Sequence, residues 1–117
     1  MQAGVGFMVL EPSQEKIATI LFEYEQTRKE LSLRRAEASR LGQVLISAGR
    51  ALSQTPGYVR FLGDSIPEAY CNPRIGGDYN PEDFDGGKLK ALTFEVRELE
   101  MKQARLAIEK ESLGYSV

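Results

Sequence analysis

The chain has 117 residues, of which 42% are hydrophobic and 27% charged, a composition typical of one soluble folded domain. The net charge of −2 is too small to indicate a partner by itself. There is no histidine, so histidine-based catalytic triads and dyads are excluded. The single cysteine, Cys71, excludes an internal disulfide and a structural zinc site.

A lone thiol favours a reducing, cytoplasmic location. Because a reactive thiol needs a cationic environment, we expect Cys71 to be a small, partly buried apolar residue and not a nucleophile. The apolar leader at residues 1–12 is interrupted by glycines and lacks the basic flank of a signal peptide. No apolar run reaches the roughly 18 residues of a membrane span, so we expect no membrane association.

Residues 13–55 predict one long helix. Ser13 is a suitable N-cap, and Pro56 disfavours helical geometry in the residue before it. A straight helix of this length, about 64 Å at 1.5 Å per residue, does not fit a compact globule. It must therefore kink or break near residues 42–49, which contain Gly42 and Gly49, or belong to an extended hairpin. Its residues at heptad spacing are mostly apolar, with polar Thr27 and Arg34 in the middle: Ile17, Ile20, Tyr24, Thr27, Leu31, Arg34, Ala38, Leu41, Leu45, Ala48 and Leu52.

Residues 88–113 predict a second helix with a leucine heptad. Its leucines recur every seven residues, and Gly114 is a suitable C-cap: Leu92, Leu99, Leu106 and Leu113. The acidic segment 83–87 stands where a leucine-zipper transcription factor has its basic region, which excludes that family. The basic side chains within residues 28–40 are scattered around the first helix, so we do not expect nucleic acid as a partner.

Together these patterns predict an all-α fold: an elongated, coiled-coil-like antiparallel helical hairpin, with a Gly/Pro-rich connection at residues 56–87, within a single domain. Each helix also has a second apolar stripe roughly opposite its heptad face. These residues are Phe22, Leu33 and Val44 on the first helix, and Phe94, Met101 and Ile108 on the second. A two-helix hairpin buries one stripe per helix. The connection could cover the others, but we favour a homo-oligomeric bundle or a docked partner.

The connection is the second candidate surface, because loops on a rigid scaffold often carry recognition. Its candidate residues are aromatic or basic: Tyr58, Arg60, Phe61, Tyr70, Arg74, Tyr79 and Phe84. Asp78, Asn80 and Glu82 have the spacing of calcium-loop ligands. The loop's required glycine and glutamate are replaced by Asp83 and Leu89, so no metal site is expected.

These observations favour a non-enzymatic protein–protein interaction module that binds itself and another protein, such as a small adaptor, an assembly subunit or a regulatory inhibitor. No cofactor is expected. The alternative is a binder of a small anionic ligand or nucleotide at an oligomer interface, through Arg60 and Arg74. Pairing of these arginines with neighbouring acids would count against that alternative.

Overall fold

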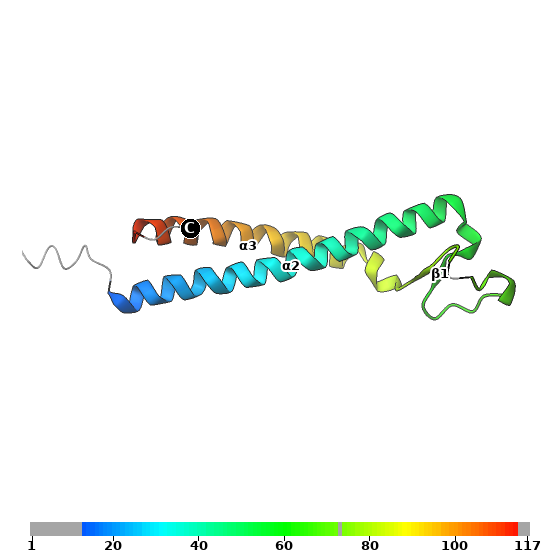
Figure 1. Cartoon of the computed structure of the whole chain (residues 1–117), viewed down its shortest axis with the longest axis horizontal. Helices are drawn as coiled ribbons and strands as arrows, with labels where there is room; N and C mark the ends of the chain where they lie inside the picture. Colours follow the sequence, from blue (N-terminus) through cyan, green and yellow to red (C-terminus); the bar gives the residue numbers. More distant parts are fainter. Residues whose placement is uncertain (1–12, 73, 115–117) are drawn as a thin grey trace, which may run out of the picture. The chain divides into compact units, whose positions relative to one another are not determined.

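The computed structural model describes residues 13–72 and 74–114, so the predicted leader at residues 1–12 lies outside the described residues. Two long helices dominate: α2 spans Gln14–Gln54 and α3 spans Gly86–Ser112 (Figure 1). Between them lie three short 3₁₀ helices, η1 (Pro56–Tyr58), η2 (Glu68–Tyr70) and η3 (Pro81–Phe84), and two short strands, β1 (Arg60–Phe61) and β2 (Asp78–Tyr79). The predicted all-α helical hairpin is confirmed.

The ends of α2 follow from local chemistry. The hydroxyl of Ser13 accepts a hydrogen bond from the amide of Lys16 at 3.1 Å, which confirms the N-cap. The helix ends at Gln54, two residues before Pro56. Gly42 and Gly49 lie within continuous helix, and each has open space where a side chain would project.

The start of α3 lies two residues before the predicted position, within the Gly86–Gly87 pair. The Asp85 carboxylate explains the difference, since it accepts hydrogen bonds from the amides of Gly87 and Lys88 at 2.9 and 3.2 Å. At the other end Gly114 has a φ of +91°, and its amide donates to the carbonyl of Glu111 at 2.9 Å. Gly114 thus ends the helix in the left-handed conformation that glycine tolerates.

The described residues form two compact units. The first unit combines α2 up to Leu33 with α3 from Glu95 onward. These segments lie side by side and antiparallel (Figure 1), and the Lys110 ammonium lies 4.3 Å from the centre of the Tyr24 ring. The buried seam of this unit holds Ile20, Thr27, Leu31 and Leu106. All four occupy predicted heptad positions.

The second unit, Arg34–Phe94, contains the rest of both helices and the whole connection. Leu41, Ala48 and Leu92 are buried in it at predicted heptad positions, but Leu45 and Leu52 are exposed. An α-helix drifts by about 20° per heptad, so Leu45 points about 80° away from Ile17, four heptads earlier. Val44, Ala51 and Thr55 are half-buried instead.

The seam of the first unit contains a polar defect on α3. The side-chain oxygen of Gln103 is buried without a hydrogen-bond partner among the described residues. A buried acceptor without a partner costs about 1–3 kcal/mol. We therefore expect Gln103→Leu to raise the free energy of unfolding by about 1 kcal/mol, measured by urea denaturation followed by circular dichroism. The exposed Gln26→Leu should change it by less than about 0.5 kcal/mol, and equal effects of the two variants would contradict this interpretation.

Candidate functional site

The first candidate surface is the pair of apolar stripes in the first unit. We call Phe22 and Leu33 the α2 stripe, and Met101 and Ile108 the α3 stripe. Their exposed fractions are 64% and 69% for the α2 stripe, and 62% and 71% for the α3 stripe. Side chains of this size are seldom left so exposed in a regular pattern. No described part of the chain covers them.

The two remaining stripe residues belong to the second unit and differ from each other. Phe94 is 56% exposed and precedes Met101 by one heptad on α3. Val44 is half-buried, on the side of α2 that turns inward as the helix drifts.

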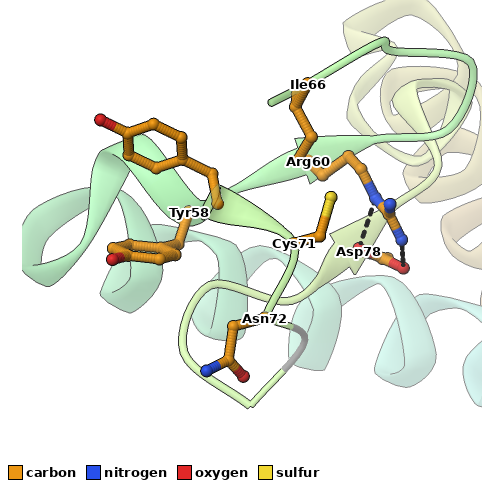
Figure 2. Close-up of a pocket in the computed structure, with 7 residues that line it drawn as sticks. Tyr58, Arg60, Ile66, Cys71, Asn72 and Asp78 are labelled. Carbon is orange, nitrogen blue, oxygen red and sulfur yellow. Dashed lines mark hydrogen bonds and ion pairs between the residues drawn. The ribbon is translucent and has the colours of Figure 1, made fainter. Parts of the chain in front are cut away.

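The second candidate surface is the connection, which is organised by a pair of parallel strands. Arg60 on β1 is in register with Asp78 on β2, and the Arg60 Nε donates to an Asp78 carboxylate oxygen at 2.9 Å. A second bond from the Arg60 Nη2 makes the pair bidentate (Figure 2). These hydrogen bonds lower the pKa of Asp78 and raise the pKa of Arg60 from their ordinary values. Arg60 is therefore already engaged by a carboxylate.

Aromatic rings pack on each other across the connection. Phe61, Tyr79 and Phe84 form a triangle with ring centres 5.6 to 6.4 Å apart. Tyr58 and Tyr70 form a separate pair at 5.3 Å. All of these rings except Tyr70 are half-buried, so most of the predicted aromatic surface serves as a small core for the connection.

Three side-chain contacts hold the connection against α2 in the second unit. The hydroxyls of Ser47 and Tyr79 share a hydrogen bond of 2.8 Å, and the Thr55 hydroxyl donates to the carbonyl of Ile75 at 3.2 Å. The Arg40 guanidinium bridges Glu37 and Asp83, at 2.9 and 3.2 Å. The hydrogen bond to Glu37 is the largest cause of a raised pKa of Arg40, and the hydrogen bond to Asp83 is the second.

The residues with the spacing of calcium ligands have other roles. Asp78 pairs with Arg60, the Asn80 side chain accepts from the amide of Glu82 at 3.0 Å, and Glu82 lies 3.5 Å from the Lys88 ammonium. Within residues 13–72 and 74–114, no three histidine, cysteine or acidic side chains are grouped as metal ligands would be. In the same ranges, no helix combines the length and the apolar character needed to cross a membrane.

Cys71 lies in a small pocket with Tyr58, Arg60 and Ile66 (Figure 2). The volume of the pocket is about 50 Å³, well below the roughly 300 Å³ at which small-molecule sites begin. The prediction that Cys71 is partly buried is wrong, because its side chain is exposed at the edge of this pocket.

A larger groove, of about 330 Å³, lies between the last turns of α2 and the segment from Arg74 to Tyr79. Of the residues predicted for a ligand surface, Arg74 and Tyr79 line this groove and Arg60 does not. Arg50, which was not among the predicted residues, lines the groove from α2. The available signal was the helical spacing of Ser47, Arg50 and Gln54, but nothing in the sequence indicates which segment faces them.

The chain was compared with models of protein families, with curated proteins and with solved structures, and none of the three comparisons gave a match.

The closest backbone approach in the connection is at Gly76, which is buried against Tyr58. A Cβ at this position would lie 2.0 Å from the Tyr58 carbonyl oxygen. We expect Gly76→Ala to destabilise the folded connection by about 3 kcal/mol, because backbone must move to relieve the overlap. Tyrosine near-ultraviolet circular dichroism should fall while the far-ultraviolet helical signal persists. Gly42→Ala is the control, since open space surrounds Gly42, and an unchanged near-ultraviolet spectrum in Gly76→Ala would contradict the packing.

The Arg60–Asp78 pair predicts acid sensitivity. Because the pKa of Asp78 is lowered on folding, its stabilisation is present above the unfolded-state pKa of about 4 and is lost as the pH falls through the folded value. Asp78→Asn should lower the urea midpoint at pH 6. The additional fall of the urea midpoint between pH 6 and pH 3 should then be smaller in this variant than in the wild type. Glu68→Gln, at an exposed carboxylate, should behave as the wild type does. Equal acid losses in wild type and Asp78→Asn would disprove the role of this pair.

Proposed function

We propose that the chain is a non-enzymatic protein–protein interaction module, and that a second copy of the chain covers its exposed stripes in a helical bundle. The observation that supports this proposal is the exposure of the α2 and α3 stripes on helices whose opposite faces are already occupied by the seam. Burial of apolar area stabilises an association by about 25 cal/mol per Å² before ordering costs.

The charges around Met101 favour a second copy as the occupant. A shallow groove of about 470 Å³ beside this residue is lined by Glu98, Leu99, Lys102 and Arg105. Its lining thus carries both signs of charge, which suits a surface of the same mixed composition better than a strongly acidic or basic partner. Leu99 and Met101 are the apolar residues of its lining.

The stripes lie on opposite outer sides of the first unit, since each is roughly opposite the seam of its own helix. A dimer formed through one stripe leaves the other available, either for more copies or for a different protein. An adaptor, an assembly subunit and a regulatory inhibitor would each use such a second face.

The alternative proposed from the sequence, an anionic ligand held by Arg60 and Arg74 at an oligomer interface, loses support in this form. The Arg60 guanidinium is held by Asp78, and Arg74 lines a groove that Arg60 does not reach.

The oligomeric state tests the proposal. Light scattering on a size-exclusion column, over a tenfold range of concentration, should give a mass above 13.0 kDa for the wild type. Met101→Glu and Leu33→Glu should each be tested alone, because loss of assembly in one variant identifies the stripe used. A buried carboxylate without a partner costs several kcal/mol, so the affinity should fall by about 100-fold or more.

Two controls separate loss of the interface from loss of fold. Met101→Leu keeps an apolar side chain and should assemble as the wild type does. Thr93→Glu adds the same charge at an exposed position on the flank of α3 and should also assemble. A wild-type mass of 13.0 kDa at every concentration would show that no second copy covers the stripes.

A further inference from the structure

The groove between α2 and the segment from Arg74 to Tyr79 is formed by contacts within the second unit. Its walls are fixed by the Ser47–Tyr79 hydrogen bond of 2.8 Å and by the bond from the Thr55 hydroxyl to the Ile75 carbonyl, 3.2 Å long. The segment from Arg74 to Tyr79 is also packed against Tyr58, through the close approach of Gly76. The groove therefore does not depend on a second copy of the chain.

The charge of the groove is opposite to that of the whole chain. Arg50 and Arg74 are among the described residues that line it, and none of these described residues carries a carboxylate. Neither guanidinium has a carboxylate within ion-pair distance in the described part of the chain, whereas Arg28, Arg40 and Arg60 do. Two guanidinium groups thus line one groove in a chain with a net charge of −2.

Neutral hydrogen-bond donors line the same groove. The Ser47 and Tyr79 hydroxyls share one bond, which uses one of their two hydrogens and leaves the other for a ligand. The side-chain amides of Gln43 and Gln54 add further N–H groups.

We propose that this groove binds the phosphate group of a small phosphomonoester. A guanidinium presents paired N–H donors that match two phosphate oxygens, and two guanidiniums balance the charge of a phosphate dianion. A monocarboxylate would neutralise only one of the two guanidinium charges. The volume of about 330 Å³ exceeds what a bare phosphate needs and is at the lower end of small-molecule sites, which leaves room for a short carbon skeleton.

The test is a nuclear magnetic resonance titration of the ¹⁵N-labelled full chain at low ionic strength, with inorganic phosphate as the probe and acetate at matched ionic strength as the comparison. We expect phosphate to shift the amide signals of residues 47–55 and 74–79 in a saturable way. Acetate should bind at least about tenfold more weakly. Equal responses to the two anions, or no saturable shift with phosphate, would overturn the proposal.

Arg50→Gln and Arg74→Gln should each weaken phosphate binding by about tenfold or more, the usual effect of losing a charge-assisted hydrogen bond. Arg97→Gln is the matched control, because it removes the same charge from an exposed position on α3 in the other unit. Amide spectra without phosphate show whether each variant keeps the fold of the connection. An affinity in both groove variants equal to that of Arg97→Gln would overturn the proposal.

A double variant, Arg50→Lys with Arg74→Lys, keeps the charge and removes the paired donors. Its affinity should lie between that of the wild type and that of the glutamine variants, and full wild-type affinity would overturn the paired-donor geometry. Met101→Glu should bind phosphate as the wild type does, so this proposal and the proposed self-association can fail separately.

Discussion

Two helices that pack against each other can each bury only one face, and the rest of this structure depends on that constraint. In the first unit the seam takes up Ile20, Leu31 and Leu106, which leaves the α2 and α3 stripes at the surface. A single-chain hairpin has no further layer to place over them. Each helix therefore has two apolar faces, of which the hairpin buries one and leaves the other for a partner to cover.

The second unit satisfies the same constraint differently. There the drift of the helix turns Val44, Ala48 and Ala51 inward, and the connection folds back along α2 through Ser47 and Thr55. The aromatic rings of the connection are at most half-buried, and polar contacts to α2 add to its order. The groove in this unit depends on the same polar contacts.

Arginine illustrates how similar residues acquire different roles in one small protein. Arg40 and Arg60 are held by carboxylates and help to fix the connection. Arg50 and Arg74 line a groove whose described lining residues include no acid. The distinction lies in which residues the fold brings opposite each guanidinium, and the spacing along the chain does not contain that information.

The sequence by itself determined the two helices, the capping roles of Ser13 and Gly114, most of the seam and the second apolar stripes, because helical periodicity and capping act over a few residues. Two features were decided only by tertiary structure: the exposure of Cys71, and the presence of Arg50 and Arg74 in the lining of one groove. Each depends on contacts between segments distant in sequence. Local periodicity specifies the faces of a helix, but the path of a Gly/Pro-rich connection is set by the specific hydrogen bonds and ring contacts that it forms across the chain.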